Sequence, residues 1–253
     1  MLKLGLVGYS GRMGQLIFEA ALESDEVEIA SIYTRTGTER LSGVHIASDW
    51  GDLLTHCDVV IDFSNPSGTR DLVRSSRLLP KPLVIGTTGL DQETLEMMRE
   101  LSQQIPIVYA TNTSQGVNIL NHLASLVASL LPDSDIEIVE MHHHHKKDSP
   151  SGTAMTLAQC CADARQVKLE HARVSGRDGN IGERKKGEIG VMSLRGGDIV
   201  GRHTVGFYCD GEYLELTHNA TSRKTFALGA IRAAQWVCDK SVGLYSMRDV
   251  LTS

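Results

Sequence analysis

The first 110 residues alternate between short apolar runs and amphipathic segments of helical length. The apolar runs typical of buried strands are Leu2–Val7, Val27–Tyr33, Val59–Ser64, Pro82–Ile85 and Ile105–Ala110. Segments such as Gln15–Leu22 lie between them and have the spacing of an amphipathic helix. Repeated strand–helix units predict a parallel sheet, with ligands at the carboxyl ends of its strands.

The pattern changes after about Gly116, where an apolar helix is expected over Val117–Leu131. The later segments with strand character are Asp135–His142, Glu188–Leu194, His203–Cys209 and Tyr213–His218. Asp210-Gly211 is a hairpin signal between the last two, and residues 172–187 are expected to be a long loop or interface arm. A helix over Arg223–Cys238 would return to the first domain. Successive strands predict a second, α+β domain with a mixed or antiparallel sheet.

The turn Gly8–Gly14 reads Gly-Tyr-Ser-Gly-Arg-Met-Gly and joins the first strand to the first helix. This is a variant of the dinucleotide fingerprint, in which glycines let the backbone approach a pyrophosphate at the helix N-terminus. A tight turn without a ligand is the alternative. We expect an α/β chain with a Rossmann-type dinucleotide-binding domain, formed by residues 1–114 and 222–253, and a second domain over residues 115–221.

The end of the second strand should select the cofactor. An NAD site usually has Asp or Glu there for the ribose hydroxyls, whereas this chain has Thr34-Arg35-Thr36. A guanidinium beside hydroxyl groups suits a 2′-phosphate, so NADPH is expected to be preferred over NADH.

Other polar residues follow strands at the same edge of the predicted sheet: Ser64, the turn Gly86–Gly89 and Asn112. Contact with a cofactor is one interpretation of the Gly86-Thr-Thr-Gly89 turn, and an ordinary connection between strand and helix is the other.

Residues 140–153 read Glu-Met-His-His-His-His-Lys-Lys-Asp-Ser-Pro-Ser-Gly-Thr. The stretch joins a predicted strand to a helix beginning near Ala154, and Ser151 suits the N-cap, so an anion could bind at the helix start. Imidazole and ammonium groups there favour proton transfer to an acidic small molecule. An expression tag and a metal site are the alternatives, but the run is internal and lacks metal-ligand spacing. His144, His145 and Lys147 are interpreted as a solvated loop.

Length and composition fit a soluble enzyme. The chain has 253 residues, a formal net charge of −6 and a pI near 5.9, which argue against general nucleic-acid binding. The N-terminus leads directly into a strand, and no apolar run is long enough to span a bilayer. Five cysteines without disulfide or metal spacing indicate a reducing cytoplasm.

The histidine–lysine stretch resembles the Glu-x-His-His-x-x-Lys-x-Asp-x-Pro-Ser-Gly-Thr signature of the 4-hydroxy-tetrahydrodipicolinate reductase (dihydrodipicolinate reductase) family. Gly8–Gly14, Gly86–Gly89, Asn112–Asn118 and Gly196–Gly201 are similar to that family in the same order, so the resemblance covers nearly the whole chain. It implies NAD(P)H-dependent reduction of a cyclic imine dicarboxylate in the diaminopimelate–lysine pathway. It also implies a homotetramer, with the second domain binding substrate and forming the oligomer.

The resemblance also implies roles for individual residues. His142 is expected to be the proton donor, Lys146 the catalytic lysine, and His143 with Gly152 and Thr153 the substrate-carboxylate site. The cofactor residues it implies, with the two from the second strand end, are Gly8, Tyr9, Ser10, Gly11, Arg12, Met13, Thr34, Arg35, Gly86, Thr87, Thr88, Ala110, Thr111, Asn112 and Thr113. No metal ligand is expected.

Two positions depart from the family pattern. The family often has an acidic residue where Thr34 stands, which bears on the use of NADH. It commonly has an aromatic residue where Thr113 stands, which bears on nicotinamide packing.

Three other classes remain open from the residues alone. A different Rossmann dehydrogenase should lack the histidine stretch, and an aldehyde dehydrogenase would need a reactive cysteine. A nucleotide-sensing regulator would leave the clustered proton donors unexplained. A metal-binding protein would leave the glycine turn unexplained.

Overall fold

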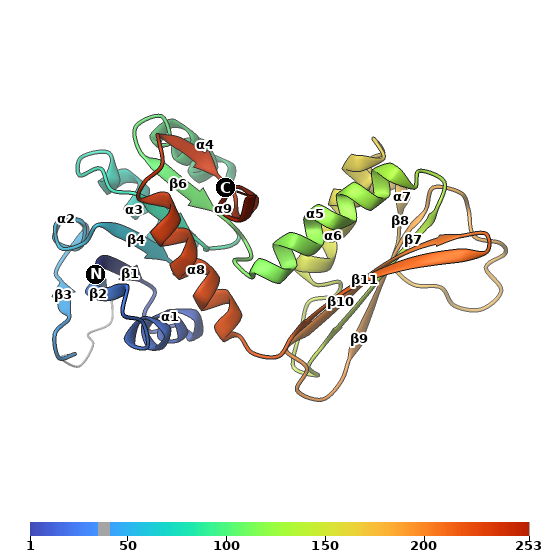
Figure 1. Cartoon of the computed structure of the whole chain (residues 1–253), viewed down its shortest axis with the longest axis horizontal. Coiled ribbons are helices and arrows are strands. Elements are labelled where there is room, and N and C mark those ends of the chain that lie inside the picture. Colours follow the sequence, from blue (N-terminus) through green and yellow to red (C-terminus); the bar gives the residue numbers. More distant parts are fainter. Residues whose placement is uncertain (35–40, 253) are drawn as a thin grey trace. The chain divides into compact units, whose positions relative to one another are not determined.

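The computed structural model describes residues 1–34 and 41–252, and its contacts divide the chain into two compact units (Figure 1). Unit 1 comprises Met1–Gln115 and Lys224–Ser253, and unit 2 comprises Gly116–Arg223. Among the described helices, none combines the length and the apolar character that a membrane crossing requires.

Unit 1 is built on a parallel sheet. Within the described residues its seven strands lie in the order β12-β6-β5-β4-β1-β2-β3. Their bounds are β1 Leu2–Val7, β2 Val27–Tyr33, β3 His45–Ala47, β4 Val59–Asp62, β5 Leu83–Ile85, β6 Pro106–Tyr109 and β12 Gly243–Tyr245. All six adjacent pairs are parallel, so the parallel sheet predicted from the sequence is confirmed.

Two layers of helices enclose this sheet. The helices are α1 Arg12–Leu22, α2 Trp50–Thr55, α3 Pro66–Ser76, α4 Gln92–Leu101, α8 Lys224–Val237 and α9 Met247–Thr252. One hydrophobic cluster joins the sheet to α1 and α8, for example through Leu4, Ile17 and Ala234. A second cluster joins it to α3 and α4, through Leu72 and Met98. The unit is therefore a doubly wound, Rossmann-type fold, as the sequence predicted.

Unit 2 is built on a mixed sheet with the strand order β11-β10-β7-β9-β8. The strands are β7 Asp135–His142, β8 Arg173–Val174, β9 Ile189–Arg195, β10 Gly201–Cys209 and β11 Glu212–Ala220. β10 is antiparallel to β7 and β11, whereas β7 and β8 are parallel to β9. The predicted mixed sheet and the hairpin at Asp210-Gly211 are confirmed, and Gly211 has the positive φ of +87° that such a turn favours.

Helices cover one face of this sheet. They are α5 Gln115–Leu130 and α6 Gly152–Ala164, with the short α7 Leu169–Ala172 after them. Leu120 of α5 and Leu157 of α6 share a core with Ile136, Ile138 and Phe207 of the sheet. Alternation along β7 places these apolar residues on the covered face and Val139 on the other.

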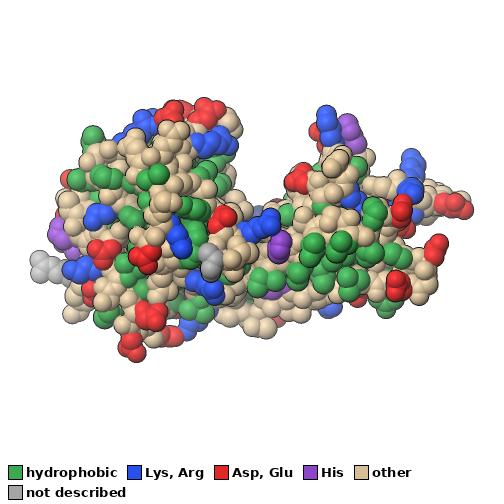
Figure 2. All heavy atoms as spheres, turned by 45° about the horizontal axis from the view of Figure 1, so that its top comes forward, with side chains coloured by type: hydrophobic (Ala, Val, Ile, Leu, Met, Phe, Trp, Pro, Cys, Tyr) green, Lys and Arg blue, Asp and Glu red, His purple; other side chains and the backbone are tan. Residues whose placement is uncertain are grey.

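Two apolar surfaces of unit 2 are exposed. The open sheet patch consists of Val139, Met141, Met192 and Leu194, which are cross-strand neighbours on the uncovered face. The α5 stripe consists of Ile119, Leu123, Leu126 and Leu130, which recur at helical spacing on the outer side of α5. Figure 2 shows hydrophobic side chains gathered on the surface of this unit.

The segment predicted as one long loop, residues 172–187, begins with the last residue of α7 and the two-residue strand β8, so the prediction is wrong for Ala172, Arg173 and Val174. The rest of the segment lacks helix and strand and is anchored to β7. Arg177 donates to both carboxylate oxygens of Glu137 at 2.9 Å, and Arg184 donates to Glu137 at 3.0 Å. The part of the segment that follows β8 is therefore held by ion pairs rather than by strand pairing.

Candidate functional site

The glycine turn after β1 has the shape that a phosphate needs. Gly8 has a φ of +88°, and the amide of Gly11 donates to the Gly8 carbonyl at 3.0 Å. A Cβ on Gly14 would lie 2.2 Å from that carbonyl oxygen, so only glycine lets the helix pack this closely. Helix α1 begins at Arg12, with no side-chain cap from Gly11, so backbone amides mark its positive end.

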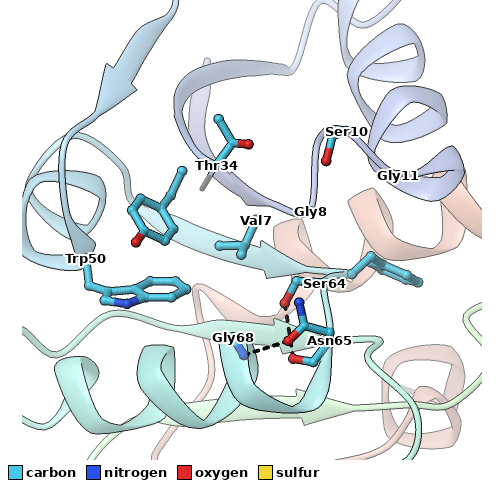
Figure 3. Close-up of a pocket in the computed structure, with 11 residues that line it drawn as sticks. Val7, Gly8, Ser10, Gly11, Thr34, Trp50, Ser64, Asn65 and Gly68 are labelled. Carbon is cyan, nitrogen blue, oxygen red and sulfur yellow. Dashed lines mark hydrogen bonds between the residues drawn. The ribbon is translucent and has the colours of Figure 1, made fainter. Parts of the chain in front are cut away.

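A cleft of about 250 Å³ lies over this turn (Figure 3). It is lined by Val7, Gly8, Ser10, Gly11, Tyr33, Thr34, Trp50, Phe63, Ser64, Asn65 and Gly68. Figure 3 shows Thr34 and Trp50 on one side of the cleft and Ser10 and Gly11 on the other. The structure thus brings Gly8, Ser10, Gly11 and Thr34 together, as expected for an adenosine pyrophosphate.

Aromatic rings close one side of this cleft. The Tyr33 and Trp50 ring centroids are 4.2 Å apart, with an interplanar angle of 44°. Trp50 begins the short helix α2, which the sequence analysis did not predict, so its place at the cleft was missed. Arg35, predicted to contact a 2′-phosphate, lies outside the described residues.

Beside the first cleft is a second one of about 550 Å³. Its lining contains Gly11, Arg12, Met13, Phe63, Ser64, Gly86, Thr87, Thr88, Thr111, Asn112, Thr113 and Phe226. Most of the residues expected near the nicotinamide therefore share one cavity. Phe63 packs against Gly86, where a Cβ would meet the ring at 2.2 Å, so the turn after β5 needs glycine there.

Thr113, where the resemblance implied an aromatic residue, is almost completely buried. Its hydroxyl donates to the carbonyl of Phe226 in α8 at 2.7 Å. A Cβ on Gly229 would lie 1.8 Å from the Thr113 carbonyl oxygen, so helix and loop are in tight contact. The aromatic wall of this cleft comes instead from Phe63 and Phe226.

Two of the expected cofactor residues, Tyr9 and Ala110, do not line either cleft. The Tyr9 ring packs edge-on against Phe18 at 5.2 Å, on the hydrophobic cluster of α1 and α8. The Ala110 amide donates to the carbonyl of Ile85 at 3.0 Å and extends the sheet contact of β6.

Asp62, at the end of β4, organises the floor of the second cleft. Its completely buried carboxylate accepts hydrogen bonds from the hydroxyls of Ser64 at 2.5 Å, Thr69 at 2.5 Å and Thr87 at 3.1 Å. Burial raises the pKa of Asp62 above its ordinary value, and these hydrogen bonds oppose the rise. The sequence analysis did not predict a role for Asp62. The available signal was an acidic residue at the end of an apolar strand.

In unit 2 the histidine stretch begins at the end of β7 and lies beside the loop that precedes β10. The carbonyl of His142 accepts from the Gly196 amide at 3.0 Å, and the His143 amide donates to Ile199 at 2.8 Å. His142 and His143 are partly buried. His144, His145 and Lys147 are exposed, in agreement with the solvated-loop interpretation.

Glu140 lies behind His142 and is completely buried. Its Oε2 accepts the Nδ1–H of His142 at 2.6 Å, and Arg195 donates to both carboxylate oxygens at 2.8 Å. Burial alone would raise the pKa of Glu140, but the hydrogen bonds from Arg195 and His142 lower it to about 2. The sequence analysis quoted Glu140 within the motif but assigned it no role, and it missed Arg195.

Two further residues, His203 and Arg223, lie next to the two histidines. The His203 ring lies edge-on to His142 at 5.1 Å, and burial lowers the pKa of His203 to about 4, so it is neutral near pH 7. Arg223 Nη2 lies 3.3 Å from His143 Nε2. Burial and the charge of Arg223 lower the pKa of His143. Neither His203 nor Arg223 was predicted as a site residue.

The expected substrate-carboxylate site lies at the start of α6. Ser151 is the N-cap, as predicted, and its hydroxyl accepts from the Ala154 amide at 3.2 Å. Gly152 and Thr153 form the first turn, at the positive end of the helix. Lys146 Nζ donates to both carboxylate oxygens of Asp148 at 2.9 Å, and this bond lowers the pKa of Asp148.

Among the described residues one group has the makeup of a metal site: His45, Asp52 and His56. Its donor atoms already bond one another, because His45 Nε2 and His56 Nδ1 lie 2.8 and 3.1 Å from Asp52 Oδ1. The group is explained as a hydrogen-bonded link between β3 and α2.

A doubly wound sheet with a glycine turn before its first helix is the fold of nucleotide-dependent oxidoreductases. Comparison with known families narrows this class. The model described as "Dihydrodipicolinate reductase, N-terminus" matches residues 2–113, and that described as "Dihydrodipicolinate reductase, C-terminus" matches residues 116–251. The chain belongs to the dihydrodipicolinate reductase family.

Individual relatives agree with this membership. The chain is 53% identical over 253 residues to 4-hydroxy-tetrahydrodipicolinate reductase of Helicobacter hepaticus, covering 99% of both chains. It is 55% identical over 251 residues to the enzyme of that name from Campylobacter jejuni, again covering 99% of each. A dipicolinate-bound dihydrodipicolinate reductase from Paenisporosarcina sp. TG-14 has the same fold, with a TM-score of 0.83, 24% identity and 97% coverage of both chains.

Proposed function

We propose that the chain reduces 4-hydroxy-tetrahydrodipicolinate to tetrahydrodipicolinate, with loss of the hydroxyl group as water, in the diaminopimelate–lysine pathway, and that NADPH is preferred over NADH. The observation that carries the catalytic assignment is the His142–Glu140 pair inside the family's signature. The buried, ionised carboxylate accepts the Nδ1–H and fixes the orientation of the imidazole, which suits a proton donor.

The described residues of unit 1 fit a dinucleotide. Gly8 and Gly14 make a cradle that a Cβ would fill, and the start of α1 offers amides to a pyrophosphate. A reduced nicotinamide nucleotide would supply the hydride. We assign its adenosine side to Thr34, Arg35 and the first cleft, and its nicotinamide side to the second cleft.

Unit 2 supplies the charges that a dicarboxylate needs. We assign the substrate carboxylates to His143, Gly152 and Thr153, with Lys146 as a further cation, because a helix start and cationic side chains favour dianions. His142 delivers a proton to the electron-rich product that follows hydride addition. The imidazolium then becomes a neutral imidazole, and its Nδ1–H remains hydrogen-bonded to Glu140.

We further propose that the active form is a homotetramer. A tetramer with two kinds of two-fold interface needs two self-complementary surfaces. The open sheet patch and the α5 stripe offer two separate apolar surfaces on one unit. We also propose that the protein works in the cytoplasm, because all five cysteines are free thiols.

The activity is tested with purified protein and the freshly made condensation product of aspartate semialdehyde and pyruvate. Loss of NADPH absorbance should depend on this substrate and should continue in the presence of a metal chelator. NADPH consumption that does not depend on the substrate, or that stops with the chelator, would contradict the proposal.

A further inference from the structure

The carboxylate of Glu140 connects three segments that are distant in the sequence. Oε2 accepts from His142 and from Arg195, and Oε1 accepts from Arg195 and from the Ser151 amide at 3.1 Å. Arg195 also donates to the carbonyl of Asp148 at 2.7 Å. One buried acid thus joins the end of β7, the end of β9 and the turn that leads into α6.

These bonds determine the tautomer of His142. An ionised carboxylate can only accept, so the hydrogen between it and Nδ1 belongs to the imidazole. The proton that His142 can give away is therefore the one on Nε2. A Cβ on Gly201 would lie 3.1 Å from this Nε2, so glycine keeps the space beside the reactive nitrogen clear.

The same carboxylate fixes the start of α6. It binds the Ser151 amide, while the Ser151 hydroxyl lies 3.2 Å from His203 Nε2 and caps the Ala154 amide. Both polar groups of the N-cap residue are therefore engaged. Gly152 and Thr153 follow directly, so movement of Ser151 would move the proposed carboxylate site.

We propose that Glu140 is a positioning residue that aligns the proton donor and the anion-binding helix start together, and that Arg195 keeps it ionised and in place. This inference rests on the proposed role of His142. Glu140 touches neither reactant; it acts through the orientation and charge of His142 and through Ser151. When the proton leaves Nε2, the negative charge of Glu140 stays and no second proton moves.

The test is Glu140→Gln, which keeps the shape of the side chain and removes its charge. We expect kcat to fall by about a hundredfold or more, as for loss of an oriented proton donor. The alkaline limb of the kcat–pH profile should shift to lower pH, because the imidazolium loses its anionic partner. The inhibition constant of dipicolinate should rise, whereas the Kd of NADPH should not change.

Glu137→Gln is the matched control. Glu137 is on the same strand and, like Glu140, is ion-paired with arginine, here Arg177 and Arg184. It faces the other side of the sheet and touches no histidine of the motif. The Glu137→Gln variant should keep the kcat–pH profile of the parent. Equal loss of kcat in both variants with unshifted profiles would mean that Glu140 is only structural, and would overturn the inference.

A double variant separates this inference from the proposed role of His142. If Glu140 acts through His142, Glu140→Gln should lower kcat no further in a His142→Gln background, and additive losses would overturn the inference. Parent-like kcat in His142→Gln alone would instead contradict the proton-donor assignment. If Glu140→Gln fails to fold, Arg195→Lys gives the same test, because it keeps the charge and loses the two-pronged contact. Parent values of kcat and of dipicolinate inhibition in Arg195→Lys would then overturn the inference.

Discussion

Lys146 holds Asp148 through both carboxylate oxygens, at 2.9 Å each. The Lys146 side chain is 20% exposed and that of Asp148 62%, so the pair lies at the protein surface. A cation in such a pair is partly neutralised by its partner. A dianionic substrate would therefore have to compete with Asp148 for the ammonium group.

The first prediction concerns this lysine. Lys146→Ala should raise KM and lower kcat together, with kcat/KM falling at least about tenfold, because a hydrogen bond to a charged group contributes about 1.5–3 kcal/mol. Asp148→Asn is the control, and its KM should be no higher than that of the parent. Unchanged kcat/KM in Lys146→Ala would mean that Lys146 belongs to the solvated loop and has no role in the reaction. Dipicolinate should compete with the substrate in steady-state kinetics.

The second prediction concerns the proton donor. His142→Gln should lower kcat by about a hundredfold or more, the usual effect of removing a general acid. The Kd of NADPH should stay the same, because the glycine turn and both clefts belong to unit 1. Single-turnover rates and equilibrium titration measure the two quantities. Turnover within a few-fold of the parent would exclude the assignment.

The third prediction concerns cofactor choice. Arg35→Ala should weaken NADPH binding and leave NADH nearly unchanged, because the guanidinium can contact only the 2′-phosphate among the groups that differ. The effect should shrink as ionic strength rises. Comparing the Kd of both cofactors in parent and variant measures it. Equal weakening of both, or tighter binding of NADH by the parent, would mean that another residue selects the cofactor.

The fourth prediction follows from the buried His203. Its pKa is lowered from 6.5 to about 4, so the unfolded chain takes up a proton at a pH where the folded chain does not. This contribution to stability is present above pH 6.5 and is lost as the pH falls towards 4, up to about 3 kcal/mol in the free energy of unfolding. Urea unfolding of parent and His203→Gln at several pH values measures it. His144→Gln, at an exposed histidine, should keep the slope of the parent.

The fifth prediction concerns assembly. Leu194→Asp in the open sheet patch and Leu126→Asp in the α5 stripe should each convert tetramers to dimers, because a buried unpaired charge opposes association. Leu78→Asp is the control, since this leucine of unit 1 is 85% exposed and belongs to neither surface. Sedimentation velocity measures the result. Tetramers in both variants would exclude these surfaces as interfaces.

Most of the fold followed from periodicity. β7 and β2 were predicted with their observed ends, because alternation or a sustained apolar run defines each strand. Helix α1 was predicted to begin at Gln15 but begins at Arg12, because Gly14 reads as a turn residue although it packs onto Gly8. β3, α2, β12 and α9 were missed, since three to six residues are too few for a period.

The site was predictable where its residues are adjacent in the sequence. The glycine turn and the histidine stretch are local patterns, and each lies within one segment of the structure. The buried acids were missed because their partners are distant: Thr87 is 25 residues from Asp62, and Arg195 is 55 residues from Glu140. Such pairs leave no local signal, so only the packed structure brings them together.

Trp50 gives the protein an internal optical probe. It is one of two tryptophans in the chain, and its indole lines the first cleft beside Tyr33. Indole emission overlaps the absorption of reduced nicotinamide, so a bound dinucleotide should quench Trp50 by energy transfer. In a Trp236→Phe variant Trp50 would be the sole indole, and its fluorescence would follow cofactor occupancy without a label.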